Sequence, residues 1–523
     1  MIFTELREQF VSSVGAKDIS PEHHRIKDMN YVKNQTFTVK VTDMSDNGEG
    51  IGRINGYTLF IKDAIIGDVV LARLTKVKKS FAYARCEQII TPSSKRIEPA
   101  CRSYRQCGGC QIQAMSYEAQ LVFKESKVRN DLIRIGGFDG PLVDSVMEGI
   151  IGCDGDRSPG YNKGFRYRNK AQFPVGTDKE GRIICGFYAG RTHSIIPNTD
   201  CLLGAEENRE ILEKVLKWMR EYAISAYDEK NQEGDIRHIF IRKGFSSGEL
   251  MVCLVINADD LKNKDELVSS LIKIKGMKSI SLSVNRKNTN VIMGDDYRTI
   301  WGSDRIEDYI GNLKFSISPM SFFQVNPRQT KKLYEKVLEY ADLSGRETVW
   351  DLYCGIGTIS LFLARGAGKV CGVEIIPEAI EDAKKNAAIN GITNAEFYVG
   401  AAEDIISEYH SGKTDIEDRD FANPDVIIVD PPRKGCGREL IEAIRAVGPE
   451  KIIYVSCDSA TLARDIRLLC APEEQLHRED PDGLQLPGCG YRLETVQPVD
   501  MFPHSVHVEC VALLSNRNAG KGN

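Results

Sequence analysis

Apolar positions in the C-terminal part of the chain form short runs that are separated by segments of helical periodicity. From about Asn326 onward this alternation is regular, which is typical of a parallel sheet wound with helices. Four of the apolar runs are TVWDLYC (348–354), KVCGVE (369–374), DVIIVD (425–430) and KIIYVS (451–456). We therefore predict an α/β, Rossmann-like domain with a mainly parallel sheet over residues 321–516.

A different pattern, of short alternating runs punctuated by glycine and asparagine, occupies residues 34–90. The five runs are QTFTVKVTDMS, DNGEGIGRINGY, TLFIKDAI, IGDVVLARLTKVKKS and FAYARCEQII. Runs of this length with such turns predict a small OB-like β-barrel, which we assign to residues 30–92.

The remaining segments carry weaker patterns. Residues 93–320 mix α and β character, with a helical pattern at 206–222, and we predict a central α+β domain there. Residues 1–29 are polar and without a clear period, so we expect a loose N-terminal extension. We expect residues 517–523 to form a short tail.

Composition narrows the class of protein. The chain has 523 residues, of which 27% are charged and 42% hydrophobic, an ordinary balance for a globular protein. No run approaches the roughly 18 apolar residues of a membrane span, and the first residues lack an apolar signal core. We expect a cytoplasmic protein without a membrane partner. In a reducing compartment its 15 cysteines are metal ligands, nucleophiles or core residues rather than disulfides.

Charge is distributed unevenly along the chain, whose formal net charge is −5. Residues 1–200 carry about 29 Lys and Arg against about 23 Asp and Glu, near +6, which leaves near −11 for the remainder. A basic N-terminal half suits a polyanion such as nucleic acid, although a solvated charged face would give the same count. Candidate phosphate contacts in the barrel region are Lys76, Lys78, Lys79 and Arg85.

Two aromatic residues, Phe81 and Tyr83, stand between these basic positions. They offer stacking faces for nucleic-acid bases. For single aromatic residues in a small barrel, however, a place in the core is the commoner arrangement, and we expect that here.

Three cysteines, Cys101, Cys107 and Cys110, form a C-x5-C-x2-C cluster in CRSYRQCGGC. Thiols at this spacing can converge on one soft metal centre, with a fourth ligand from elsewhere. Cys201 is the best remote candidate, and Cys153 and Cys185 follow it. Spacing alone leaves zinc and an iron–sulfur cluster both open.

The run TVWDLYC is followed by GIGTIS, in which Gly355 and Gly357 permit close approach of a ligand to the backbone. The next strand ends at Glu374, an acid placed to bind the two hydroxyls of a ribose. A dinucleotide site would need a third glycine where Ser360 stands. Asp351, just before the loop, suits the amino group of a methionine moiety. These features favour S-adenosylmethionine as cofactor.

Cys457 stands where KIIYVS ends and the helix-like SATLARDIRLL begins. A thiol facing the N-terminus of a helix has a lowered pKa and reacts as a thiolate, and we expect this for Cys457. The alternative is a buried structural cysteine.

Two carboxylates complete the candidate chemistry. Asp430 precedes two prolines in DPPRKG, a rigid, extended turn. In methyltransferases a similar turn lines the slot for a planar base, and the alternative is a purely structural turn. Glu509 lies on an alternating strand close to His504 and His507, either of which could compete with it as a base. A thiolate that adds to carbon 6 of uracil activates carbon 5 toward a methyl donor, and a base must then remove the carbon 5 proton. We assign Cys457 as the nucleophile, Asp430 as the residue that holds the ring and Glu509 as the base. For a lone strand glutamate, the alternative is an exposed edge residue.

Over nearly its whole length the chain resembles the uracil-5 RNA methyltransferases, and most closely their iron–sulfur branch that acts on 23S ribosomal RNA. The barrel resembles the TRAM domain in NGEGIGR and GDVVLARLTKVKKS. The other motifs that carry the resemblance are C-x5-C-x2-C with a distant cysteine, SFFQVN, DLYCGIGTISL, GVEI, DPPRKG, YVSCDSATLARD and DMFPHSVHVE.

The resemblance implies a four-iron, four-sulfur cluster on Cys101, Cys107, Cys110 and Cys201. It implies donor contacts from Gln324, Tyr353, Glu374 and Asp430, with Cys457 as nucleophile and Glu509 as proton acceptor. Two departures from the family pattern are Asp458, where many relatives have Asn, and Thr358, where some have Asn.

The activity implied is a 23S rRNA (uracil-5-)-methyltransferase that gives 5-methyluridine through a covalent Cys–uracil adduct. The partner implied is large-subunit ribosomal RNA, and no obligate protein partner is evident. Two alternatives stand beside it. One is the same chemistry on transfer RNA, and the other is a non-catalytic RNA-binding or assembly factor.

Overall fold

The computed structural model describes residues 31–153, 164–190, 192–411, 423–472 and 490–517. The expected extension at 1–29 and most of the expected tail lie outside these residues. The chain forms two compact units. The barrel unit contains the chain up to Arg105 together with Cys110–Ser126 and His504–Val506, and the large unit contains Gln106–Gly109, Lys127–Pro503 and the chain from His507.

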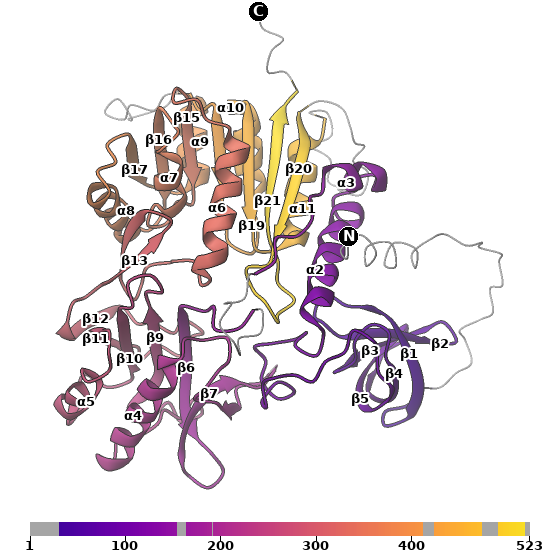
Figure 1. Cartoon of the computed structure of the whole chain (residues 1–523), viewed down its shortest axis with the longest axis vertical. Coiled ribbons are helices and arrows are strands. Elements are labelled where there is room, and N and C mark those ends of the chain that lie inside the picture. The colour runs from indigo at the N-terminus through magenta and orange to yellow at the C-terminus, as the bar shows by residue number, and fades with distance from the viewer. Residues whose placement is uncertain (1–30, 154–163, 191, 412–422, 473–489, 518–523) are drawn as a thin grey trace, which may run out of the picture. The chain divides into compact units, whose positions relative to one another are not determined.

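The barrel unit is built on five strands that close into a barrel in the order β1-β2-β3-β5-β4, which confirms the predicted barrel (Figure 1). The strands β2 and β3 are joined by Asn55 and Gly56, both with positive φ, as a tight two-residue hairpin requires. The strands are β1 (Thr36–Met44), β2 (Gly50–Ile54), β3 (Tyr57–Lys62), β4 (Val69–Val77) and β5 (Phe81–Thr91).

Alternate residues of these strands fill the barrel interior. Leu59, Ile61, Val70 and Leu74 are among its fully buried side chains. Phe81 and Tyr83 are only half-buried and lie out of phase with the buried Ala82 and Ala84. Their side chains therefore point to the outer face, and the expectation that they fill the core is wrong.

The large unit contains a seven-stranded mixed sheet in the order β12-β11-β10-β9-β6-β7-β8. Helices α4 (Glu207–Glu221) and α5 (Lys264–Leu271) cover one face of it, and α4 matches the helix predicted at 206–222 (Figure 1). The strands are β6 (Lys170–Thr177), β7 (Ile183–Tyr188), β8 (Ile195–Pro197), β9 (Ile236–Lys243), β10 (Leu250–Ile256), β11 (Met277–Val284) and β12 (Asp296–Gly302).

A second seven-stranded sheet follows in the order β17-β16-β15-β18-β19-β21-β20. Its first five strands are parallel and β21 lies antiparallel between β19 and β20, so the predicted mainly parallel α/β domain is confirmed. The strands are β15 (Thr348–Leu352), β16 (Lys369–Glu374), β17 (Ala395–Val399), β18 (Val426–Val429), β19 (Lys451–Ser456), β20 (Tyr491–Val499) and β21 (Glu509–Asn516).

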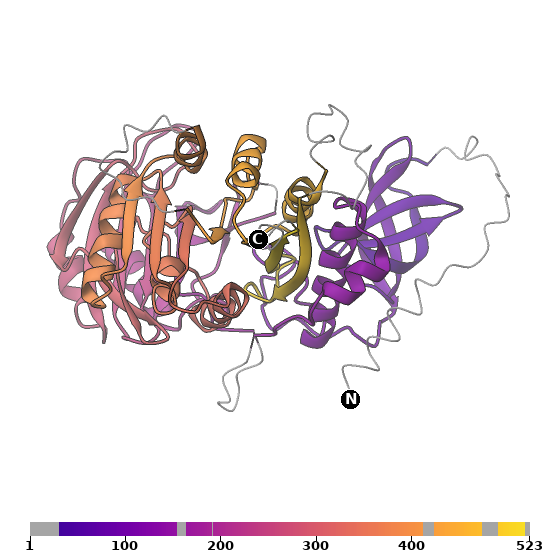
Figure 2. The same cartoon turned by 90° about the horizontal axis from the view of Figure 1, so that it is seen from above.

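Helices cover both faces of this sheet (Figures 1 and 2). One layer is α6 (Pro327–Ala341), α7 (Thr358–Leu363) and α8 (Pro377–Ile389), and the other is α9 (Ala402–Ser411), α10 (Arg438–Val447) and α11 (Ser459–Cys470). The remaining described elements are α2 (Tyr117–Arg134), α3 (Gly140–Val146) and the hairpin of β13 (Ile306–Ile310) with β14 (Leu313–Ile317). None of the helices in the described ranges has the length and apolar character to cross a membrane.

The strand order reverses between β15 and β18. The connections from β15 lead outward to β16 and β17, whereas the chain then returns to place β18 and β19 on the other side. In open α/β sheets, ligands bind outside the carboxyl ends of the strands at such a switch point. The candidate site residues of this domain follow those ends.

Candidate active site

Three reactive side chains come from three neighbouring strands. Asp430 directly follows β18, Cys457 directly follows β19, and Glu509 is the first residue of the antiparallel strand β21. In the register of β19 and β21, Ser456 is paired with Cys510, so Glu509 lies beside the end of β19 that carries Cys457. The sheet therefore brings the predicted nucleophile, the predicted base and Asp430 to one edge.

The environment of Cys457 opposes ionisation of its thiol. Burial, followed by the charges of Glu509 and Asp430, raises the pKa of Cys457 to about 11, and only Arg433 acts in the opposite direction. The expected lowering of this pKa by the helix is therefore wrong for the protein without ligands. Desolvation and the nearby carboxylates act against the dipole of α11.

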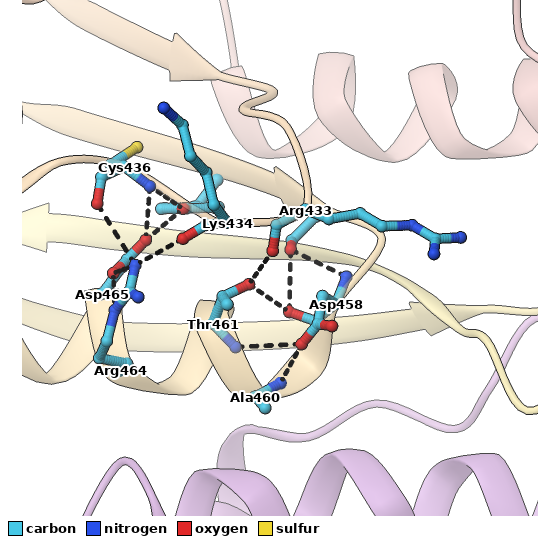
Figure 3. Close-up of polar contacts among 10 residues, drawn as sticks. Arg433, Lys434, Cys436, Asp458, Ala460, Thr461, Arg464 and Asp465 are labelled. Atoms are coloured by element: carbon cyan, nitrogen blue, oxygen red, sulfur yellow. Dashed lines mark hydrogen bonds and ion pairs between the residues drawn. The ribbon is translucent and has the colours of Figure 1, made fainter. Parts of the chain in front are cut away.

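Asp458 explains part of this result. Its side chain caps α11 and accepts hydrogen bonds from the backbone N–H groups of Ala460 at 3.0 Å and Thr461 at 3.2 Å (Figure 3). A carboxylate at this cap satisfies the helix donors and puts a negative charge next to Cys457. The asparagine expected here from the family pattern would cap the helix without the charge.

The two carboxyl groups are also perturbed. Burial raises the pKa of Asp430 to about 7. Glu509 is 2% exposed, and burial together with Asp430 raises the pKa of Glu509 well above its usual range, while Arg433 lowers it. Two neighbouring buried carboxyl groups do not both ionise easily, and Glu509 can act as a base only in its ionised form, which Arg433 favours.

The loop that carries Asp430 and Arg433 is fastened to α11 by a buried acid. Asp465 is 0% exposed and accepts hydrogen bonds from the Tyr454 hydroxyl at 2.6 Å and from the Cys436 backbone N–H at 2.8 Å. It also accepts one from Arg464 at 2.7 Å, and Arg464 donates to the Lys434 carbonyl at 3.0 Å (Figure 3). We call Cys436, Tyr454, Arg464 and Asp465 the Asp465 cluster.

Gly435 allows this fastening. Its φ is +76°, and a Cβ built on it would lie 2.4 Å from the Asp465 carboxylate. A side chain at this position would therefore separate the loop from α11.

The glycine loop after β15 is joined to the acid at the end of β16. The Gly355 backbone N–H donates to the Glu374 carboxylate at 3.2 Å, and the φ values of Gly355 and Gly357 are positive. The space where a Gly355 side chain would begin is open to 4 Å, so the backbone there is accessible to a ligand. The predicted contact of Glu374 with a cofactor stays a prediction.

Asp351 is already bonded within the protein. It is 1% exposed and accepts a hydrogen bond from the Ser360 hydroxyl, and burial raises the pKa of Asp351 to about 7. This arrangement ties β15 to α7. The suggested contact of Asp351 with a methionine amino group stays a prediction.

The two other predicted cofactor contacts lie in loops. Gln324 is 6% exposed in the loop between β14 and α6, and its backbone carbonyl accepts from Asn169 at 2.9 Å. Tyr353 has a φ of +69°, and its hydroxyl donates to Glu403 at 2.8 Å. Because that hydroxyl is engaged by α9, a cofactor would meet the ring or the backbone of Tyr353. The nearby Thr358 hydroxyl is bonded to Tyr334 at 2.8 Å.

The competing histidines have other contacts. His504 belongs to the barrel unit, is 3% exposed, and is joined to Gln120 both by its ring at 3.2 Å and by its backbone N–H at 2.9 Å. His507 is half-buried with its ring 6.3 Å from that of Phe502. Glu509 is the group that shares an edge with Cys457.

The four predicted cluster cysteines are divided between the units. Cys101 and Cys110 belong to the barrel unit, whereas Cys107 and Cys201 belong to the large unit, and none is in a disulfide. Within the described residues the structure contains no group of three or more His, Cys, Asp or Glu side chains arranged to bind a metal ion. The iron–sulfur cluster therefore stays a prediction.

Sequence reasoning did not single out three candidate features of the site. Arg433 is the cation that stabilises charge on both Cys457 and Glu509, and its signal was the basic residue within DPPRKG. Asp465 is the last residue of the motif YVSCDSATLARD, and its position in the motif did not indicate its bonds to the loop 430–436. Ile375 is 63% exposed directly after Glu374, and an exposed apolar residue beside the predicted ribose contact offers a surface for a planar base.

Comparison with known proteins places this geometry in a family. Residues 245–517 match the family described as tRNA (Uracil-5-)-methyltransferase, and residues 32–86 match the TRAM domain. Two relatives, each named an uncharacterized RNA methyltransferase, come from Clostridium tetani and Bacillus cereus. The Clostridium tetani relative is 45% identical over 94% of this chain and 98% of its own length. The Bacillus cereus relative is 44% identical over 92% of this chain and 97% of its own length.

A solved structure is similar over most of the chain. It is the Pyrococcus abyssi tRNA (uracil-54, C5)-methyltransferase in complex with S-adenosyl-L-homocysteine, with a TM-score of 0.68 and 28% identity over 92% of this chain and 100% of that one. The matches cover both the barrel and the α/β domain that carries Cys457, Asp430 and Glu509. The chain therefore belongs to the RNA uracil-5 methyltransferase family, whose enzymes use S-adenosylmethionine, and it carries a TRAM domain.

Proposed function

We propose that this enzyme methylates carbon 5 of a uridine in 23S ribosomal RNA through a covalent adduct between Cys457 and carbon 6. The main support for the adduct is that adjacent strands bring Cys457, Asp430 and Glu509 to one edge of the sheet. A thiol, a neighbouring acid and a buried proton acceptor are the groups that this reaction needs.

The adduct makes carbon 5 nucleophilic. The Cys457 sulfur bonds to carbon 6, and the electrons of the carbon 5–carbon 6 double bond move onto oxygen 4 as an enolate. The thiol proton leaves to solvent, which reaches the half-buried Cys457. Arg433 favours the thiolate, because it is the cation that lowers the pKa of Cys457.

S-adenosylmethionine supplies the methyl group as a sulfonium when it is bound. Carbon 5 bonds to that methyl carbon as the carbon–sulfonium bond breaks. Glu509, in its ionised form, then takes the proton from carbon 5, the double bond to carbon 6 forms again, and the Cys457 thiolate is expelled. The raised pKa of Glu509 makes its carboxylate a stronger base for this proton. Asp430 contacts the ring, and its rigid Pro431-Pro432 turn holds it in place.

The ribosomal substrate is supported by the cysteine set, which resembles the ribosomal branch of the family, whereas the barrel lies within the match to a tRNA enzyme and does not discriminate. Transfer RNA is the second candidate, because the structurally similar Pyrococcus abyssi enzyme is named for uracil-54 of tRNA. Both reactions require the target uridine to leave its stack and enter the site. A cytoplasmic location fits either substrate.

We also propose that Cys101, Cys107, Cys110 and Cys201 hold a four-iron, four-sulfur cluster, which would tie loops together rather than transfer electrons. Four thiols are the donor set that such a cluster requires. Two of the sulfurs already accept hydrogen bonds in the structure. The Gln113 amide donates to the Cys110 sulfur at 3.8 Å, and the Gly109 N–H donates to the Cys107 sulfur at 3.4 Å. Protein purified without oxygen should contain iron and sulfide, and zinc in their place would contradict the cluster.

The adduct can be trapped with RNA that contains 5-fluorouridine, because Glu509 cannot remove fluorine from carbon 5. We expect wild-type protein to form an RNA conjugate that survives denaturation. Cys457→Ala should give neither conjugate nor methylation, and Glu509→Gln should accumulate the adduct on ordinary RNA. Methyl transfer by Cys457→Ala would refute the mechanism.

The substrate class is tested separately. Ribosomal RNA and transfer RNA, both transcribed without modifications, are incubated with enzyme and S-adenosylmethionine, and 5-methyluridine is mapped by nuclease digestion and mass spectrometry. We expect label in the large-subunit RNA. Label in transfer RNA alone would select the second candidate and leave the adduct mechanism intact. No label in either RNA, with both RNAs bound, would favour the non-catalytic binding factor.

A further inference from the structure

Three aromatic rings gather on the outer face of the barrel. Phe60 of β3 faces outward with Phe81 and Tyr83 of β5, and the three rings have centroid separations of 5.5 to 5.8 Å. In the strand register Phe60 is paired with Tyr83, so the rings occupy adjacent positions on one surface. We call Phe60, Phe81 and Tyr83 the ring patch.

The barrel core does not need these rings. The residues that alternate with them, among them Leu59, Ile61, Ala82 and Ala84, are buried at 0 to 4% exposure and fill the interior from the same strands. The rings themselves are half-buried on the opposite side of the strands. Three neighbouring aromatic residues at the surface of a small barrel indicate a binding surface rather than packing.

The surroundings of the ring patch are cationic. Lys76 is the cross-strand partner of Tyr83, and Lys78 and Lys79 are exposed in the turn that leads to Phe81. The nearby Glu87 is paired with Arg73 and Arg85, so its charge is compensated. The surface therefore combines planar apolar faces with positive charge, which complements bases joined by phosphates.

We propose that the ring patch binds an unpaired segment of the substrate RNA by stacking two or more bases on Phe60, Phe81 and Tyr83. The lysines beside it contact the phosphates of the same segment. A duplex would not satisfy this surface, since its bases already stack on each other, so the recognised element is a loop, bulge or single-stranded flank. The inference requires an RNA substrate, but neither the covalent adduct nor ribosomal RNA in particular.

The test separates bases from phosphates. Full-length Cys457→Ala protein, which cannot turn over, is titrated with a short single-stranded RNA and with an RNA of the same length whose central nucleotides lack bases. Both ligands keep their phosphates. We expect the Cys457→Ala parent to bind the RNA with bases more tightly than the RNA without them. Adding the double substitution F60L/Y83L should lower the affinity for the RNA with bases by about 5- to 150-fold and leave the affinity for the other RNA unchanged.

Ile51→Ala provides a matched control. Ile51 lies next to Phe60 in the register of β2 and β3, so this variant removes apolar surface from the same row while the rings stay. We expect it to bind both RNAs like the parent, and circular dichroism should show that all variants fold, since none alters the barrel core. A third variant, Lys76→Gln, should weaken binding to both RNAs equally.

Two outcomes would overturn the inference. If F60L/Y83L weakens binding to both RNAs equally, the rings do not stack on bases. If it changes neither, the ring patch serves a protein partner instead. Because binding alone is measured, failure here is distinct from failure of the methylation mechanism, which the conjugate assay reports.

Discussion

At the residue scale, the central feature is Cys457, the proposed nucleophile, whose surroundings hold it in the thiol form. Burial and two facing carboxylates raise the pKa of Cys457 to about 11, although the residue stands at a helix N-terminus. Position in the sequence identified Cys457, but it gave the wrong sign for the pKa shift. The charges that decide this shift come from Asp430 and Glu509, which are 27 and 52 residues away along the chain and become neighbours only when β18 and β21 flank β19.

The raised pKa predicts slow alkylation of Cys457 in the free enzyme. Since the thiolate reacts and the thiol does not, the rate should rise about tenfold per pH unit between pH 8 and pH 10 and level off only near pH 11. Iodoacetamide labelling, quantified by mass spectrometry of the Cys457 peptide, measures it. Arg433→Gln should slow labelling further at every pH in this range. A labelling rate that levels off near pH 7 would show that the helix dipole lowers the pKa of Cys457 despite burial and the two carboxylates.

Asp458 offers a second change at this scale, because its cap and its charge can be separated. Asp458→Asn keeps an oxygen that can accept from Ala460 and Thr461, and it removes the negative charge next to Cys457. We expect alkylation at pH 8 to become about 3- to 10-fold faster with little loss of stability. Asp458→Ala removes both cap and charge, and should add a loss of about 1 kcal/mol in thermal or chemical denaturation. An unchanged rate in Asp458→Asn would exclude Asp458 as a cause of the raised pKa.

At the element scale, the site depends on how α11 and the loop 430–436 are held together. The Asp465 cluster joins Cys436 and Lys434 of the loop to the helix that begins just after Cys457 (Figure 3). This connection positions Asp430 and Arg433 relative to Cys457. The bonds of the Asp465 cluster run to the loop and to the helix, so we assign it a positioning role.

Asp465→Asn should therefore reduce kcat more than it changes KM for RNA. The amide cannot accept from Arg464 and from the Tyr454–Cys436 pair at once, and a displacement of the loop by about 1 Å can cost about 100-fold in rate. We expect kcat to fall about 10- to 100-fold and stability by about 1–3 kcal/mol. Steady-state methylation assays and denaturant titration measure both.

Arg438→Gln is the matched control for Asp465→Asn. Arg438 is paired with Glu442 at 2.9 Å on the exposed side of α10, and such surface pairs contribute about 1 kcal/mol or less. Its kcat should equal that of the wild type. Equal kcat values for Asp465→Asn and the wild type would remove the positioning role.

The elements themselves were largely predictable from the sequence, and their contacts were not. Alternating runs predicted the barrel, and the strand–helix alternation predicted the parallel sheet, because each pattern is local. The outward direction of Phe81 and Tyr83 was missed, since a residue type does not say which face of a strand is filled first. It follows instead from Ala82 and Ala84, whose small side chains occupy the interior. Likewise, the switch point between β15 and β18 could not be predicted from local patterns, because it depends on the order of the strands in the sheet.

At the scale of the whole molecule, an acidic chain must bind an acidic polymer. The formal net charge is −5, but the barrel region carries exposed Lys76, Lys78 and Lys79 close to the ring patch, and most of the acidic excess lies beyond residue 200. RNA binding should therefore depend on a local positive surface against a repulsive background. Such binding gains most of its free energy from release of counterions and weakens steeply with salt.

The triple variant K76Q/K78Q/K79Q tests this directly. Each lost phosphate contact removes about 0.7 to 0.9 from the slope of log affinity against log salt, so the loss of three should make the slope shallower by about 2 to 3. Because these lysines lie outside the catalytic edge, kcat at saturating RNA should stay unchanged while KM rises. The control K262Q/K273Q/K275Q removes the same charge from exposed positions around α5 and should leave the slope as it is. Equal slopes for the two variants would mean that net charge, and not the barrel surface, governs RNA binding.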